Sequence, residues 1–230
     1  MRAPAAVLFD MDGTLVDTEV LWWETAREVA AGLGHRLTDA DAPEVVGRAV
    51  ADTAAHLIGV TGADADALDR TAAELTGSFF RKVDAGAPLR PGAAALLASL
   101  EAAGVPFALV SASPRSVVDA VVAGSLAGVD FAFTLSADDT VRTKPHPDPY
   151  RAAAGRFAAA PSACVAVEDS PDGTASADAA GCGVLVVPSL LPVAPGQGRT
   201  FARSLEEVDL AVLSDCLRRP NPEIRGPEPA

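Results

Sequence analysis

Short apolar runs alternate with stretches of helical periodicity along much of the chain. Residues 5–9 are apolar without alternation, which predicts a strand buried on both faces. Further strands are predicted over residues 106–110, 131–135, 164–167 and 184–187. Helices are predicted between them, over residues 91–104, 114–123, 147–160 and 172–180. Strands that alternate with helices predict right-handed crossovers and therefore a parallel sheet.

One long block departs from this alternation. No strand is predicted in it, and helices are predicted over residues 18–34, 39–46, 50–58 and 64–83, the first with Thr18 as its N-cap. The block is an insertion, because the first strand belongs to the same sheet as the later ones. The predicted fold class is α/β: a Rossmann-like parallel-sheet core of residues 1–16 and 89–217, with an inserted all-helical cap domain of residues 17–88.

The last part of the chain has weaker signals. Residues 188–198 form a loop broken by prolines, and a helix is predicted near residues 205–216. Residues 218–230 are rich in proline and charge, which predicts a disordered tail.

Composition and charge limit the classes of function. Hydrophobic residues make up 49% of the 230 residues, enough for a sizeable core. The net charge of −13 argues against a nucleic-acid binder, although a bound cation would still permit an anionic substrate. No apolar run reaches the roughly 18 residues of a membrane span. Three cysteines without C-x-x-C spacing favour reduced thiols, so we expect a cytoplasmic protein without a membrane partner.

Reactive polar residues follow four of the five predicted strands. In a doubly wound sheet, ligands bind beyond the carboxyl ends of the strands. The residues found there are Asp10, Asp12, Ser111, Ser113, Lys144, Glu168 and Asp169. Four carboxylates close to one lysine are unfavourable unless a cation binds among them. Oxygen ligands favour Mg²⁺, which also accepts a phosphate oxygen.

Each of these residues also has an ordinary structural explanation when it is taken alone. The D-x-D-G-T segment at Asp10 fits a turn, and it fails the pattern of a calcium-binding loop. Ser111 fits a solvated loop and Lys144 a surface position. Glu168 and Asp169 precede Ser170, which fits a helix N-cap. The order of all of them on successive strand ends favours a shared site.

Four segments carry a resemblance to a known family. They are "DMDGTLVDTE" (residues 10–19), "LVSASPR" (109–115), "KPHPDPY" (144–150) and "VEDSPDGTASADAAG" (167–181). Over residues 5–187 the sequence resembles the haloacid dehalogenase superfamily, in the helical-cap branch (subfamily I) of β-phosphoglucomutase-like enzymes and phosphatases.

The resemblance implies a set of catalytic roles. Asp10 corresponds to the nucleophile that forms an aspartyl phosphate, and Asp12 to the general acid and base. Ser111 corresponds to the residue that hydrogen-bonds the transferring phosphoryl group, and Lys144 to the lysine that neutralises its charge.

The resemblance also implies a Mg²⁺ site and a substrate site. The metal ligands would be Asp10, the backbone carbonyl of Asp12, and Asp169, with Glu168 as a further ligand or as a residue that holds a metal-bound water. The residues expected to bind the substrate are Ser111, Ala112 and Lys144, together with Trp22 and Arg48 of the cap.

The expected activity is that of a Mg²⁺-dependent phosphatase acting on a small phosphorylated metabolite, such as a sugar or polyol phosphate. The alternatives are a phosphomutase of the β-phosphoglucomutase type and a catalytically idle binding protein. Trp22 stands where the mutases carry a histidine, and Val50 stands near the place of a cap arginine, which favours the phosphatase. The sequence leaves open whether Trp22 and Trp23 both lie in the cap core, and whether the protein is a monomer or a homodimer.

Overall fold

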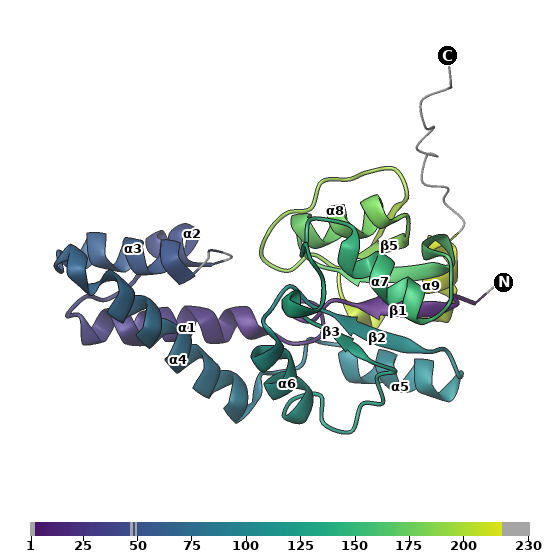
Figure 1. Ribbon diagram of the computed structural model, residues 1–230, viewed down its shortest axis with the longest axis horizontal. Helices are drawn as coiled ribbons and strands as arrows, with labels where there is room; N and C mark the ends of the chain where they lie inside the picture. The colour runs from purple at the N-terminus through teal and green to yellow at the C-terminus, as the bar shows by residue number, and fades with distance from the viewer. Residues whose placement is uncertain (1–2, 47, 49, 218–230) are drawn as a thin grey trace, which may run out of the picture. The chain divides into compact units, whose positions relative to one another are not determined.

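The sheet has the connectivity of a doubly wound α/β fold. The computed structural model describes residues 3–46, 48 and 50–217, so the predicted tail of residues 218–230 lies outside it. Within the described residues, six parallel strands follow the order β3-β2-β1-β4-β5-β6 (Figure 1). The strands are β1 Ala6–Phe9, β2 Phe107–Val110, β3 Thr134–Leu135, β4 Cys164–Glu168, β5 Gly183–Val186 and β6 Arg199–Phe201.

Helices occupy most of the segments between the strands. The α-helices are α1 Thr18–Gly32, α2 Ala42–Val45, α3 Val50–Thr61, α4 Leu68–Gly86, α5 Ala93–Ala102, α6 Arg115–Ala123, α7 Asp148–Arg156, α8 Pro171–Ala180 and α9 Leu210–Cys216. Short 3₁₀ turns are η1 Asp39–Asp41, η2 Ala65–Ala67, η3 Ala137–Asp139, η4 Pro161–Ala163 and η5 Leu205–Glu207.

One local prediction is wrong, and one strand was not predicted. The N-cap of α1 is Asp17, whose side chain accepts a hydrogen bond from the backbone N–H of Val20, and Thr18 is already the first helical residue. Strand β6 lies between the predicted loop of residues 188–198 and the last predicted helix, in a segment for which no element was predicted. It is short and mostly polar, so its own sequence has a weak strand propensity. Its pairing with β5, which aligns Val184 with Arg199, stabilises the extended conformation.

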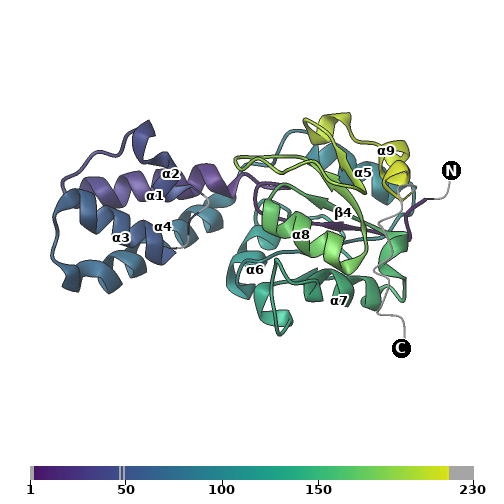
Figure 2. The same ribbon diagram turned by 90° about the horizontal axis from the view of Figure 1, so that it is seen from above.

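Continuous apolar runs form the central strands because helices cover both faces of the sheet. All residues of β1, β2, β4 and β5 are buried. Figure 2 shows α7 and α8 over one face, and α5 and α9 over the other. On the first face Leu8, Val110 and Val184 pack with Tyr150 and Ala177 in one hydrophobic cluster. The sheet is therefore rigidly held where its carboxyl ends present polar side chains.

The described chain divides into two compact units. The sheet unit comprises the residues up to Leu15, Arg90–Val118 and the chain from Gly128 onward. The helical unit comprises Val16–Leu89 and Asp119–Ala127. The last of these segments holds the second half of α6, which the sequence assigned to the α/β core.

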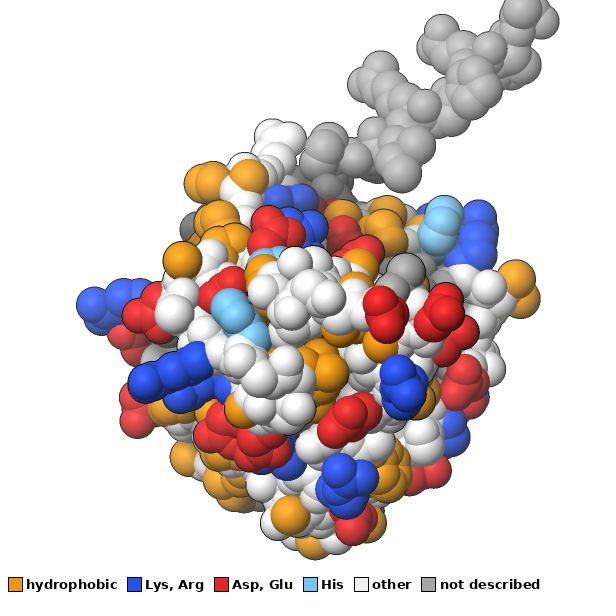
Figure 3. Space-filling view, turned by 90° about the vertical axis from the view of Figure 1, so that its left-hand side faces the viewer, with side chains coloured by type: hydrophobic (Ala, Val, Ile, Leu, Met, Phe, Trp, Pro, Cys, Tyr) orange, Lys and Arg blue, Asp and Glu red, His pale blue; other side chains and the backbone are white. Residues whose placement is uncertain are grey.

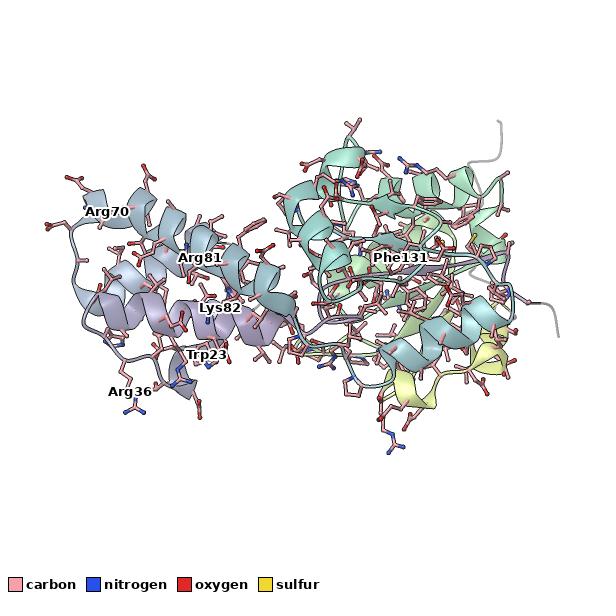
Figure 4. The ribbon with its side chains drawn as sticks, turned by 90° about the horizontal axis from the view of Figure 1, so that it is seen from below. Trp23, Arg36, Arg70, Arg81, Lys82 and Phe131 are labelled. Carbon is pink, nitrogen blue, oxygen red and sulfur yellow. The ribbon has the colours of Figure 1, made fainter. Side chains whose placement is uncertain are left out.

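The helical unit has its own core. Val29, Leu57 and Leu75, from α1, α3 and α4, are buried together in it. Lys82 on α4 lies beside α1, where its ammonium is 2.8 Å from Glu28 and 3.7 Å from Glu24 (Figure 4). The unit begins and ends side by side, since the N–H of Asp17 donates to the carbonyl of Pro88 at 2.8 Å.

The surface carries charges of both signs. The face shown in Figure 3 has acidic and basic side chains interspersed with apolar ones. Among the described residues, no helix combines the length and the apolar character that a membrane crossing requires.

Candidate active site

The first strand delivers Asp10 to the carboxyl edge of the sheet. Its backbone N–H donates to the carbonyl of Val167 at 3.0 Å, so β-pairing with β4 continues into this residue. The side chain is buried, with 6% of the residue exposed. Its Oδ1 accepts a hydrogen bond from Lys144 at 2.6 Å. Its Oδ2 is buried and has no hydrogen-bond donor among the described residues, which is unusual for a carboxylate oxygen.

Lys144 lies on the loop before α7, and its ammonium bridges two buried carboxylates. Its Nζ lies 2.6 Å from Asp10 Oδ1 and 2.6 Å from Glu168 Oε1. It also lies 5.2 Å from the centroid of the Tyr150 ring. Burial alone would lower the pKa of Lys144, but the charges of Asp10 and Glu168 outweigh it and raise the pKa well above its usual range. The lysine is therefore held as a cation.

Glu168 ends β4 and is fully buried. Its Oε1 accepts hydrogen bonds from Lys144 and from the hydroxyl of Tyr150, and its Oε2 accepts one from Ser170 at 3.3 Å. Burial raises the pKa of Glu168, and the charge of Lys144 opposes this rise. Burial and the nearby carboxylates raise the pKa of Tyr150 as well, so its hydroxyl remains a donor.

A glycine makes room for this carboxylate at the start of α8. A Cβ built on Gly173 would lie 1.9 Å from Glu168 Oε2, closer than any real contact. The backbone N–H of Gly173 donates to Ser170 Oγ at 3.1 Å, which makes Ser170 the N-cap of α8. The expected helix cap at Ser170 is thereby confirmed, and it lies two residues after Glu168.

Asp12 points to a different set of partners. Its Oδ2 accepts hydrogen bonds from Ser111 at 3.2 Å and from Ser113 at 2.8 Å, both on the loop after β2. Ser111 is buried, and Asp12 is partly exposed. The carboxylate of Asp12 is not part of the group formed by the carboxylates of Asp10, Glu168 and Asp169.

Asp169 lies against the turn that follows Asp12. Thr14 Oγ1 donates to Asp169 Oδ1 at 3.4 Å. Gly13 has a φ of +82°, and a Cβ at this position would lie 2.2 Å from Asp169 Oδ2. Glycine therefore serves here both for its backbone conformation and for the close approach of a carboxylate.

The residues present fit a divalent cation. Oxygen atoms of Asp10, Glu168 and Asp169 lie within 4.8 Å of one another, and all three side chains are buried. With Lys144 beside them, these groups carry a formal charge of −2. Asp10 Oδ2 lacks a hydrogen-bond donor within the described ranges of the chain, and an all-oxygen set of ligands suits Mg²⁺. Glu168 is already engaged by Lys144 and Tyr150, so Asp10 and Asp169 are the better placed ligands.

The remaining predicted site residues lie elsewhere in their units. Ala112 is exposed on the loop between Ser111 and Ser113. In the helical unit, Trp22 donates its indole N–H to the carbonyl of Val45 at 2.9 Å. Trp22 and Trp23 both pack, partly buried, against the core of that unit. Arg48 is exposed and its Nε donates to the carbonyl of Pro43 at 3.0 Å.

Two residues that contact the predicted site had no role assigned from the sequence, although Ser113 was already placed beside Ser111 after the second predicted strand. Tyr150 hydrogen-bonds Glu168, and Ser113 makes the shorter of the two serine contacts to Asp12. Tyr150 is the only tyrosine in the chain and closes the segment "KPHPDPY". The position of this single tyrosine, in the same segment as Lys144, was the signal in the sequence that could have assigned it to the site.

Fold and site together define a class of protein: a Rossmann-like α/β enzyme with a helical unit inserted after β1 and a cluster of carboxylates and a lysine at the carboxyl edge of its sheet. The model of the haloacid dehalogenase-like hydrolases matches residues 4–181, and the chain belongs to this family. The resemblance and the fold class expected from the sequence are thereby confirmed.

Several known proteins are similar to this chain. Hexitol phosphatase A of Escherichia coli (strain K12) is 34% identical over 194 residues, covering 78% of this chain and 81% of the relative. The crystal structure of CbbY from Rhodobacter sphaeroides in complex with phosphate has a TM-score of 0.74 and 27% identity, covering 92% of this chain and 99% of that one. A putative β-phosphoglucomutase from Thermotoga maritima, at 24% identity, has a TM-score of 0.78 and covers 91% of this chain and 98% of its own; it shares the fold.

Proposed function

We propose that this protein is a Mg²⁺-dependent phosphatase that hydrolyses a small phosphorylated metabolite through an aspartyl-phosphate intermediate. The observation that supports the proposal is the environment of the two carboxylate oxygens of Asp10. One of its oxygens is held by Lys144 at 2.6 Å, and the other is buried without a hydrogen-bond donor from the part of the chain that the structure describes. Such a carboxylate is oriented and poorly solvated, as a nucleophile must be.

In the first step, Asp10 attacks the phosphorus atom and the bond to the leaving alkoxide breaks. Ser111 donates a hydrogen bond to a phosphoryl oxygen, and Lys144 offsets the added negative charge. Asp12, protonated at this stage, gives its proton to the leaving oxygen, so that an alcohol departs. The products of this step are the free alcohol and an acyl phosphate on Asp10.

In the second step, water attacks the same phosphorus atom. Asp12, now ionised, removes a proton from this water, and the bond between phosphorus and the Asp10 oxygen breaks. Inorganic phosphate is released and the Asp10 carboxylate is restored. Asp12 regains in this step the proton that it gave up in the first.

Asp10, Asp169 and the backbone carbonyl of Asp12 would hold the cation. Bound Mg²⁺ would supply positive charge to the phosphoryl oxygens. Glu168, engaged by Lys144 and Tyr150, would act by holding the lysine in place.

The substrate class rests on similarity and on the residues present. The names of related proteins include two hexitol phosphatases of Escherichia coli, which supports a sugar or polyol phosphate. Trp22, packed on Val45 and on Phe79 in the helical unit, does not offer the ionisable side chain that the mutase alternative requires at this position. The substrate-binding roles of Ala112, Trp22 and Arg48 remain part of this proposal.

The experiment is a phosphate-release assay on para-nitrophenyl phosphate and on a panel of sugar and polyol phosphates, with Mg²⁺ and with EDTA. Wild type is expected to release phosphate only with the metal, and Asp10→Asn to release none. Activity that survives unchanged in Asp10→Asn contradicts the mechanism. A phosphorylated isomer in place of free phosphate identifies the mutase alternative.

A further inference from the structure

The loop after β2 brings two hydroxyl groups to one carboxylate oxygen. Ser113 Oγ lies 2.8 Å from Asp12 Oδ2, and Ser111 Oγ lies 3.2 Å from the same atom. The backbone N–H of Ser113 also donates to Ser111 Oγ, at 2.9 Å. Ser113 therefore contacts Asp12 directly and also orients the other serine.

A network of side chains fixes the backbone of this loop. The carbonyl of Ser113 accepts a hydrogen bond from Ala137 at 2.9 Å. Arg115 donates to Thr134 Oγ1 at 2.7 Å and pairs with Asp139, and its backbone N–H donates to Asp138 at 2.8 Å. Ser113 is thus tied to the loop after β3, and its side chain is held beside Asp12.

The two serines differ in the hydrogen bonds that they donate during the proposed reaction. A hydroxyl has one proton to donate. When Ser111 donates that proton to a phosphoryl oxygen, it can no longer donate it to Asp12. Ser113 does not donate to the phosphoryl group in this reaction, so it keeps its shorter hydrogen bond to Asp12 Oδ2.

We infer that Ser113 is a positioning residue for Asp12, which fixes Oδ2 so that Oδ1 faces the group that exchanges a proton. The inference rests on the proposed function, because it assigns a support to the general acid and base of that reaction. It concerns proton transfer and not substrate affinity. A Ser113 variant should therefore lose kcat without a rise in KM.

The test compares Ser113→Ala, Ser113→Thr and the control Ser116→Ala, which removes an exposed hydroxyl three residues further on. Each is assayed with para-nitrophenyl phosphate and with glycerol 2-phosphate, beside wild type and Asp10→Asn. Nitrophenolate departs without a proton, whereas the glycerol alkoxide needs one. Hydrolysis of the acyl phosphate is the same for both substrates.

For Ser113→Ala we expect kcat to fall about 10–100-fold, the contribution of one hydrogen bond to a charged group, with the KM for glycerol 2-phosphate within about twofold of wild type. The loss should be larger with glycerol 2-phosphate. With para-nitrophenyl phosphate, the second step should become slower than the first, so rapid mixing should show an initial burst of nitrophenolate and KM should fall together with kcat. Ser113→Thr, which restores the hydroxyl, should recover most of the loss, and Ser116→Ala should match wild type.

Other results overturn the inference. A raised KM with unchanged kcat would make Ser113 a substrate contact. An equal loss in Ser113→Thr and Ser113→Ala would show that the hydroxyl is not what matters. An active wild type with an unaffected Ser113→Ala variant overturns the inference alone, whereas a wild type without phosphate release overturns the proposed function and the inference with it.

Discussion

Replacing Lys144 with methionine tests whether the lysine and the expected cation share one task. Methionine keeps an unbranched side chain of similar size but removes the ammonium. Asp10 and Glu168 then lose the hydrogen bonds that Lys144 donates at 2.6 Å to each of them. Two buried carboxylates remain near each other without this cation, and the folded state is destabilised relative to the unfolded chain, where water solvates both.

The magnitude follows from the burial of the pair. Removing one partner of a buried ion pair costs about 3–5 kcal/mol of folding free energy. One kcal/mol shifts the Tm of a domain of this size by about 2–4 °C. In EDTA we therefore expect the Tm of Lys144→Met to fall by about 6–20 °C. Mg²⁺ bound as proposed would supply positive charge to the same carboxylates, so the metal should raise the Tm of the variant more than that of wild type.

The assay is thermal unfolding followed by circular dichroism, in EDTA and in saturating magnesium chloride. The matched control is Lys82→Met, which removes a lysine that is paired with two exposed glutamates on the helical unit. Such surface pairs contribute about 0–1 kcal/mol, and neither buffer should separate this control from wild type by much. Equal melting temperatures of wild type and Lys144→Met in EDTA, or equal shifts on adding Mg²⁺, would refute the reasoning.

Three further predictions test other parts of the structure. The pKa of Asp139 is lowered to about 2, despite its burial, by the hydrogen bonds and the arginine around it. This stabilisation is complete above the ordinary carboxyl pKa of about 4. It is lost as the pH falls towards about 2, so the Tm deficit of Asp139→Asn should shrink over that range; a constant deficit would contradict this. Gly173→Ala puts a Cβ 1.9 Å from Glu168 Oε2 and should lower both Tm and activity. The control Gly155→Ala, where a Cβ meets nothing within 4 Å, should raise stability by up to about 1 kcal/mol; similar effects of both would be evidence against the packing argument. Burial raises the pKa of Cys182 to about 12, and all three cysteines are buried. Ellman's reagent should therefore label the native protein slowly, and it should label all three thiols in guanidinium. Fast labelling of the native protein would disprove this protection of the thiols.

Much of the fold could be predicted because its strands carry their own signal. The five predicted strands were apolar and bounded by turns, and all five occur in the sheet. Strand β6 could not be found in this way, because Arg199–Phe201 is only three residues long and mostly polar. Its place depends on pairing with β5 and on the contact of Arg199 with Asp178 on α8. Both are tertiary interactions that a local pattern does not encode.

The membership of the polar cluster was also predictable, but its internal contacts were not. Parallel strands bring their carboxyl ends to one edge, so Asp10 and Glu168 were expected near one another, whereas Lys144 comes from the loop before α7. Spacing along the chain does not fix which oxygen each donor reaches. That choice depends on side-chain torsions and on the packing of α7, which carries Tyr150 onto the sheet. The bond from Tyr150 to Glu168 is therefore visible only in the structure.

The two aspartates that follow β1 differ because the strand ends between them. Asp10 still donates its backbone N–H to Val167, and this holds its side chain in the buried cluster with Lys144. Beyond it the backbone turns, since the N–H of Leu15 donates to the carbonyl of Met11 at 3.0 Å. The turn takes Asp12 away from the lysine to a partly exposed place beside Ser113. In the proposed reaction the nucleophile must stay ionised and oriented, whereas the acid and base must exchange protons. Because the strand ends between them, Asp10 lies in the buried cluster with Lys144, whereas Asp12 lies at a partly exposed position where it can exchange protons.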